Sequence, residues 1–313
     1  MNLMKYKKTY LLFAAALLMG CSFLYYHFVL AADQTTISIS PLTFDLSANP
    51  GDTVTNELLV RNSGAEDAVI SAETQDFVAV GETGEVNLTN EKTTYSLASW
   101  IEMDTSQFVL KGGQQQRIKF VVRVPFNAEP GGHYASVFAH LSPTIGNATS
   151  GSGVGQKIGA LVLLRVSGDA KEAANVATFD TSKGIYEKGP VEFDLRVENT
   201  GSVHIKPAGI IAVTDIFGKK VADVSMEQNR VLPGAIRKMT ATWDKPPLMG
   251  KFTATLLTYY GTDNKQLSAA TTFWVIPWTL IIIWLSVIIV VFVVLWLGRV
   301  RIKSAIKAFI NSK

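Results

Sequence analysis

The sequence predicts an all-β protein made of two tandem immunoglobulin-like β-sandwiches and one C-terminal transmembrane helix. Three observations support this prediction. The middle of the chain consists of short runs of alternating hydrophobicity, separated by turns rich in Gly, Pro and Asn. A set of strand motifs recurs in the same order, which indicates two copies of one fold. Near the C-terminus, an uncharged apolar run of 24 residues is long enough to cross a membrane.

Residues 1–31 have the pattern of a secretory signal peptide. Three lysines precede a long apolar stretch, and small residues around Ala31 suit cleavage before the chain turns polar. Two alternatives stay open. Cys21 ends a loose lipidation motif, Leu18-Met19-Gly20-Cys21, and the apolar stretch is also long enough to remain as an uncleaved span.

The internal repeat defines the domain organisation. The pattern Val54, Leu58, Val60, Asn62, Gly64 recurs at a spacing of 137 residues as Val191, Leu195, Val197, Asn199, Gly201. Further along, Val109-Leu110-Lys111-Gly112 is matched by Val231-Leu232-Pro233-Gly234, and Gly132-His133-Tyr134 by Gly250-Lys251-Phe252. We expect the aromatic residue of the last pair to fill the end of each sandwich core. The sequence therefore predicts a first sandwich over 32–168 and a second over 169–273.

The C-terminal run, 274–297, is the predicted transmembrane helix. Trp274 and Trp278 at one end and Trp296 at the other suit the two membrane interfaces. Arg299, Arg301 and Lys303 follow it, and this basic cluster predicts a cytoplasmic tail over 298–313. The expected topology is a single-pass type I protein of the cell membrane with an extracellular ectodomain. The tail is either a short amphipathic helix on the inner leaflet or a simple stop-transfer signal.

Charge and motif content exclude several classes of function. Eight of the 29 basic residues lie at the two ends, which leaves 21 basic against 26 acidic residues between them, so no nucleic-acid partner is expected. The sequence contains no HExxH, GxSxG, phosphate-binding Gly loop or CxxC motif. We therefore predict no enzyme, catalytic residue, metal site or cofactor. His133, His140 and His204 are interpreted as packing or surface residues.

The segment 142–156 is the candidate binding loop. It contains Gly146, Gly151, Gly153 and Gly155 together with several serines, between two predicted strands of the first sandwich. A connection of this length inside a compact domain is usually either functional or a disordered spacer. Both interpretations stay open.

A family resemblance rests on short stretches of the first sandwich. They are Ser40-Pro41-Leu42-Thr43-Phe44-Asp45-Leu46, Pro50-Gly51-Asp52-Thr53, Val60-Arg61-Asn62, Val124-Pro125 and Gly131-Gly132-His133-Tyr134. Together with the predicted topology, they resemble the WxL-interacting proteins of bacterial cell surfaces. The resemblance implies that the first domain binds peptidoglycan and that the second contacts host or surface proteins. Pilus-chaperone-like sandwiches share these motifs.

The leading hypothesis is a membrane-anchored extracellular binding protein whose first domain contacts the cell wall or a surface protein. One alternative is a membrane-tethered, pilus-chaperone-like protein that lends a strand to secreted subunits. Another is a structural accessory subunit of a membrane complex. In each case the function depends on contact rather than on reaction, and exposed strand edges are the expected binding elements.

Overall fold

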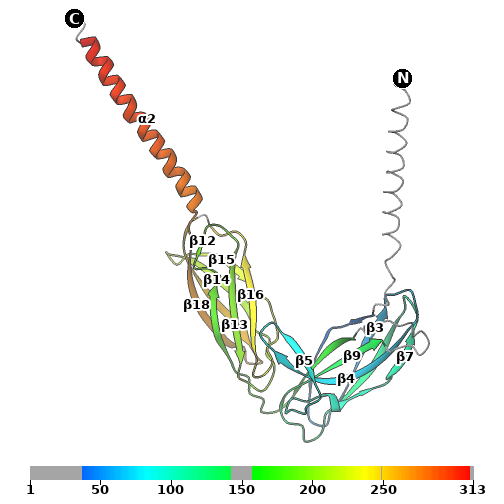
Figure 1. The fold of residues 1–313 in the computed structure, drawn as a ribbon. Coiled ribbons are helices and arrows are strands. Elements are labelled where there is room, and N and C mark those ends of the chain that lie inside the picture. The colour runs from blue at the N-terminus through cyan, green and yellow to red at the C-terminus, as the bar shows by residue number, and fades with distance from the viewer. Residues whose placement is uncertain (1–36, 142–156, 248, 311–313) are drawn as a thin grey trace, which may run out of the picture.

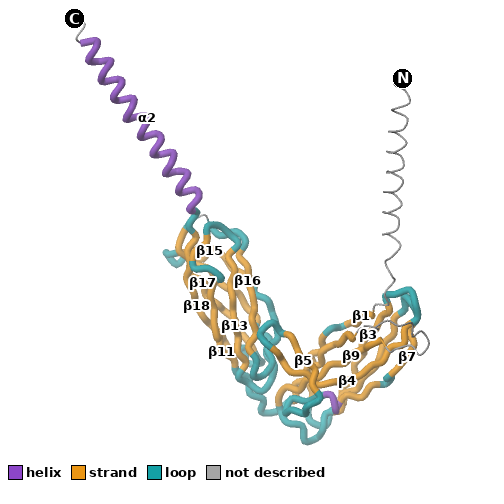
Figure 2. Tube along the Cα trace, viewed as in Figure 1, coloured by secondary structure: helices purple, strands orange, loops and turns teal. Residues whose placement is uncertain are grey.

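The computed structural model describes residues 37–141, 157–247 and 249–310. These residues form two β-sandwiches that follow one another and a long helix at the C-terminal end (Figures 1 and 2). The predicted all-β fold with one apolar C-terminal helix is confirmed. The predicted signal peptide, including Cys21, and the candidate binding loop with Gly146, Gly151, Gly153 and Gly155 lie outside the described residues.

The first sandwich consists of two sheets. One has the order β1-β3-β8-β6, and the other has the order β2-β10-β9-β4-β5, with β7 also paired to β4. The chain enters through β1 on the first sheet and crosses after Pro41 to β2, which runs parallel to β10 on the second. The bounds are β1 Ile37–Ser40, β2 Thr43–Ala48, β3 Thr53–Asn62, β4 Ala68–Val80, β5 Glu85–Thr89, β6 Ile101–Met103, β7 Gln107–Leu110, β8 Gln115–Arg123, β9 Gly131–Leu141 and β10 Lys157–Val166.

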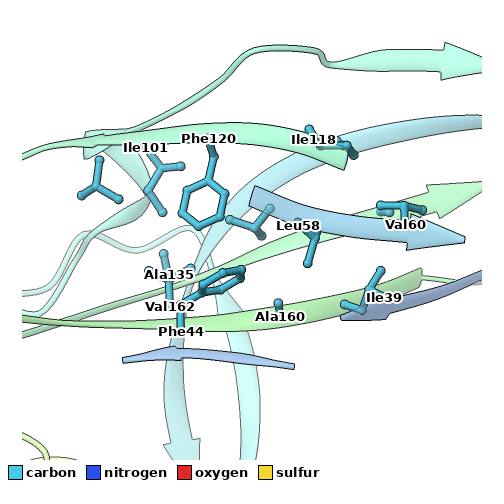
Figure 3. Close-up of a cluster of buried hydrophobic side chains, with 14 of the residues drawn as sticks. Ile39, Phe44, Leu58, Val60, Ile101, Ile118, Phe120, Ala135, Ala160 and Val162 are labelled. Carbon is cyan, nitrogen blue, oxygen red and sulfur yellow. The ribbon is translucent and has the colours of Figure 1, made fainter. Parts of the chain in front are cut away.

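Period-two alternation builds the first core. Leu58 and Val60 of β3 face Ala160 and Val162 of β10 across the sandwich, and Phe120 of the neighbouring strand β8 points toward Phe44 of β2 (Figure 3). Phe120 and Phe44 meet edge to face, with ring centroids 5.0 Å apart. These side chains are buried without disulfides, so apolar burial and interdigitation hold the two sheets together.

The second sandwich repeats the plan with fewer strands. A sheet of order β11-β13-β16 packs on a sheet of order β12-β18-β17-β14-β15. Its core is separate from the first, and the predicted boundary at Gly168 falls between the last core residue of β10 and the first of β11. The bounds are β11 Ala174–Thr181, β12 Ile185–Tyr186, β13 Val191–Asn199, β14 Ala208–Asp215, β15 Lys220–Ser225, β16 Ile236–Trp243, β17 Gly250–Tyr260 and β18 Lys265–Val275.

Two buried asparagines show that the sequence repeat is also a structural repeat. Asn62 donates from Nδ2 to the carbonyls of Glu66 and Leu110, at 2.7 and 3.1 Å, and accepts the N–H of Gly64. Asn199 donates to the carbonyls of Val203 and Val231, at 2.9 and 2.8 Å, and accepts the N–H of Gly201. Both side chains have no exposed area. Each asparagine therefore ties the turn after its strand to a later segment of the same sandwich.

Helix α2, Trp278–Ile310, begins later than the sequence predicted. Trp274, predicted as the first residue of the span, lies in β18, where it pairs with Lys251 of β17 and Ile185 of β12. The apolar run hides this boundary because the end of a buried strand and the start of a span have similar composition. The first helical bond runs from the N–H of Ile281 to the carbonyl of Pro277, whose missing N–H costs nothing at a helix start.

The helix contains one segment, Trp278–Arg299, that is long and apolar enough to cross a membrane, with mean hydropathy 3.3. None of that segment is buried against the sandwiches. Trp296 and Arg299 lie within it, and the helical backbone continues through Arg301 and Lys303. These findings are consistent with a single-pass membrane anchor near the C-terminus.

Candidate functional site

The candidate site lies at the contact between the two sandwiches. In β4, β9 and β10, side chains of one parity fill the first core, so those of the other parity face outward. Phe77, Tyr134 and Leu163 belong to this outward set, yet they are buried and form a small separate cluster. Leu232 of the second sandwich packs against them. The outer face of the sheet that contains β4, β9 and β10 therefore packs against the second domain.

This position corrects one expectation from the sequence. Tyr134 was expected to fill the end of the first core, as Phe252 does in the second. Its ring instead packs on Phe77 and Tyr95 outside that core, with centroids 6.0 and 6.1 Å away. Gly132 makes room for it, since a Cβ there would lie 1.9 Å from the Tyr134 hydroxyl. The aromatic residue of the repeated motif thus packs inside the core of the second sandwich, as Phe252, but contacts the other domain from the first sandwich, as Tyr134.

A polar network joins the domains beside this cluster. The Tyr134 hydroxyl accepts the backbone N–H of His204 at 2.8 Å, and His204 Nε2 lies 3.0 Å from Asp45 Oδ1. Arg230 Nε donates to Asp45 Oδ2 at 2.9 Å. The other ring nitrogen of His204, Nδ1, lies 3.4 Å from the Tyr134 hydroxyl. Four side chains and one backbone group therefore hold the two sandwiches in register.

The pKa values of Asp45 and Tyr134 are shifted in opposite directions, for different reasons. The hydrogen bond from His204, together with the charges of His204 and Arg230, lowers the pKa of Asp45 to about 2 against the cost of partial burial. Burial raises the pKa of Tyr134 well above its ordinary range, because the phenolate would be poorly solvated there. Asp45 is therefore an anion and Tyr134 a neutral hydroxyl at neutral pH.

We expect Asp45 to stabilise the protein in a pH-dependent manner. A carboxyl whose folded pKa is depressed adds stability above its unfolded pKa and loses it as pH falls through the folded value. The shift from 3.8 to about 2 corresponds to roughly 2 kcal/mol. Asp45 is 46% exposed, so screening should reduce this to about 1 kcal/mol.

The measurement is urea unfolding of the wild type and Asp45→Asn from pH 6 to pH 2. The difference in free energy of unfolding should be about 1 kcal/mol at pH 6 and should shrink from pH 4 downward. Asp263→Asn, at an exposed turn between β17 and β18, is the control and should leave the profile unchanged. A pH-independent difference for Asp45→Asn would contradict the assigned role.

The turn between β4 and β5 forms the other half of the contact. Glu82 at its tip receives two hydrogen bonds from the Arg196 guanidinium, and its carbonyl accepts the N–H of Lys238 at 2.8 Å. The bonds from Arg196 lower the pKa of Glu82 and raise that of Arg196. Because β16 is the last strand of its sheet, this turn covers part of an otherwise open edge.

Two hollows open along this contact. The smaller has a volume of about 190 Å³, and the larger has a volume of about 520 Å³. They share a wall made by Phe77, Ala79, Gly81, Leu232, Ala235 and Ile236. We call both together the interdomain cleft. The shared wall is apolar and comes from both sandwiches, while Glu85, Asn229 and Arg230 also line the smaller hollow.

Arg237 lies in the wall of the smaller hollow. Its Nε is buried without a hydrogen-bond partner, and within the described residues no carboxylate oxygen lies within 4.0 Å of its guanidinium. The guanidinium lies over Gly84, where a Cβ would come within 0.9 Å of Nη1 and where φ is +84°. The cleft therefore combines an apolar shared wall with a cation that has no ion-pair partner in the described chain.

The sequence-predicted site residues do not gather at this cleft. Trp274 lies in β18, at the opposite end of the second sandwich. The other predicted residues belong to α2, namely Trp278, Trp296 and Arg299 together with the backbone of Arg301 and Lys303. The residues that sequence reasoning missed are Asp45, Tyr134, His204, Arg230 and Arg237. Only Asp45 and Tyr134 belonged to quoted motifs, and His204 was interpreted as a packing residue. No local pattern marked the others.

Comparisons with known proteins give only distant similarities. No protein-family model matches the chain, and no curated protein matches it. Among solved structures, it is similar to the class 5 fimbriae chaperone CfaA, at 14% identity and a TM-score of 0.41, over 76% of this chain and 99% of that one. It is also similar to the E. coli chaperone DraB, at 14% identity and a TM-score of 0.37, over 75% and 96% of the two chains.

A protein of unknown function from Porphyromonas gingivalis W83 also matches, at 14% identity and a TM-score of 0.30, over 75% of this chain and 99% of that one. Identities and scores this low carry no information about partner or activity.

Proposed function

We propose that this chain is a membrane-anchored protein that binds a segment of another protein in the interdomain cleft. The single observation that carries the proposal is Arg237, a cation with a buried, unpartnered Nε in a hollow between two domains. A buried donor left without a partner costs free energy, and a ligand carboxylate would remove that cost. The apolar walls suit the aliphatic or aromatic side chains next to such a carboxylate.

The fold supports an anchored role for this binding. Helix α2 follows β18 after two residues, Ile276 and Pro277, and its apolar segment contacts neither sandwich core. We place the ectodomain outside the cell membrane and the basic end of α2 inside, as the positive-inside rule predicts. A non-enzymatic role and the resemblance to WxL-interacting proteins stay predictions.

A photo-crosslinking experiment tests the proposal in cells that express the full chain. A photoreactive phenylalanine analogue replaces Val78, which is 40% exposed and lines the larger hollow. The same analogue at Val109, 61% exposed on β7 and away from the cleft, is the control. Position 78 should give a protein adduct that position 109 does not give. A glycan adduct would instead favour binding of the cell wall, and no adduct would contradict the proposal.

Replacing Arg237 by glutamine should then lower the yield of the adduct by at least about tenfold, because a hydrogen bond to a charged group contributes roughly 1.5–3 kcal/mol. Lys238→Gln is the matched control. Its side chain lies on the same strand but pairs with Asp194, so its removal should leave the adduct unchanged. Equal adduct yields from Arg237→Gln and the wild type would exclude Arg237 as the anchor of the ligand.

A further inference from the structure

The end of the second sandwich next to α2 exposes an unusual set of apolar side chains. β12, β14 and β15 gather there at the foot of the helix (Figure 1). Phe217 is 87% exposed, Met249 67% and Ile216 65%. We call this surface the collar, and it comprises Ile185, Ile216, Phe217, Met249, Trp274 and Trp278. Exposed apolar groups gathered at one end of a domain normally mark a surface that contacts something else.

The turn that presents Phe217 is held in place. The Asp215 carboxylate accepts the N–H groups of Phe217 and Lys219 at 2.9 and 3.0 Å, and the Asp215 N–H donates to the Lys219 carbonyl. Gly218 supplies the positive φ, +77°, that the turn requires. Asp215 pairs with Phe252 near the start of β17, which places the turn at the α2 end of the sheet. The exposed ring is therefore displayed by an ordered turn.

The position of Met249 relative to α2 indicates how far the collar reaches. Met249 lines one apolar groove together with Pro277, Leu280, Ile281, Trp284, Leu285 and Ile288. It therefore lies beside the first turns of the helix. If those turns enter a bilayer, Met249 lies at the depth of the headgroups and the upper acyl chains.

Exposed lysines surround the collar. Lys183, Lys188, Lys219, Lys245 and Lys251 are exposed in the loops and strand ends at this end of the domain. Among the nearby acids, Glu187 accepts the N–H of Thr279 at the start of α2, Asp215 holds its turn, and Asp223 pairs with Lys220. Glu192 and Asp244 are further exposed acids at this end of the domain. Lysines beside exposed aromatic side chains are typical of surfaces that bind the membrane interface.

We propose that the collar rests on the headgroup layer of the membrane, with Phe217, Ile216 and Met249 inserted and the five lysines on anionic phospholipid. This inference depends on the part of the proposed function that places α2 in a bilayer. It adds that the ectodomain does not swing freely above its anchor but is held to the surface at a second point.

The test uses the full chain in nanodiscs of zwitterionic lipid, with and without anionic phospholipid. Single cysteines replace Phe217, Asp263 or Val287 in a Cys21→Ser background and carry an environment-sensitive fluorophore. The fluorophore at position 217 should show a blue-shifted emission and should be quenched by spin-labelled lipid. Aqueous iodide should quench it several-fold less than the fluorophore at position 263, which lies at the far end of the domain. Anionic lipid should strengthen these effects, and Lys219→Glu with Lys245→Glu should weaken them.

Position 287 separates failure of the collar from failure of the anchor. It lies inside the apolar segment of α2 and should be quenched by lipid whenever that segment spans the bilayer. Lipid quenching at 287 together with aqueous behaviour at 217 would overturn the collar and leave the anchor intact. Aqueous behaviour at both positions would overturn the anchor and the collar together.

Discussion

Replacing Phe273 by alanine should lower the free energy of unfolding of the second sandwich by about 3–5 kcal/mol. Phe273 has no exposed area and lies at the centre of an aromatic cluster. Its ring centroid is 5.7 Å from that of Phe252, 5.8 Å from Phe193, 6.0 Å from Tyr186 and 6.3 Å from Trp243. Removal of the ring leaves a cavity bordered by stiff aromatic side chains, which relax poorly into the space.

Chemical denaturation of the wild type and Phe273→Ala, followed by tryptophan fluorescence, measures this change. Because each sandwich has its own core, two transitions are expected, and only the one that involves the second sandwich should shift. Phe217→Ala removes an equally large ring that is 87% exposed and should change stability by less than about 0.5 kcal/mol. A small effect of Phe273→Ala would mean that the cluster is not the packed centre of this domain.

Replacing Asn199 by alanine should destabilise the second sandwich by about 2–4 kcal/mol, since each buried polar group left without a partner costs roughly 1–3 kcal/mol. The change leaves the carbonyls of Val203 and Val231 and the N–H of Gly201 without the side chain that binds them. Asn62→Ala removes the equivalent bonds in the first sandwich and should have an effect of similar size there.

The two variants form a matched pair. In thermal unfolding, Asn62→Ala should lower the transition temperature of the first sandwich, and Asn199→Ala should lower the transition temperature of the second. Asn87→Ala, at an exposed position of β5, is the control and should leave both temperatures unchanged. If one variant had no effect, the two asparagines would not be equivalent, and the repeated motif would be a coincidence of sequence.

The repeated asparagine turns show which part of the fold can be predicted from the sequence. The Asn-Ser-Gly and Asn-Thr-Gly turns after alternating strands specify a local geometry, because the asparagine side chain completes the turn itself. Alternation and turn chemistry depend on neighbours in sequence. The two-sandwich prediction and the uncharged span are statements of this kind, and the structure shows an all-β fold with one apolar helix.

The interdomain cleft depends on information that a single sequence pattern does not contain. Alternation in β9 shows that Tyr134 and Val137 point to opposite faces, but it does not show which face meets another domain. His204 and Arg237 come from the other sandwich and become significant only when the sheets are placed together. The prediction for Trp274 is wrong for a related reason, since hydropathy does not distinguish the end of an apolar strand from the apolar helix that follows it.

The short junction between β18 and α2 fixes the distance between the start of α2 and the interdomain cleft. The cleft lies at the end of the second sandwich remote from α2, where β13 ends and β16 begins. β17 and β18, each of 11 residues, connect the two ends and extend for about 35 Å at the usual rise per residue. If α2 spans a membrane and the cleft binds a partner as proposed, the second sandwich sets the height of the cleft above the lipid surface. The binding segment of the partner must then project about 35 Å from that surface.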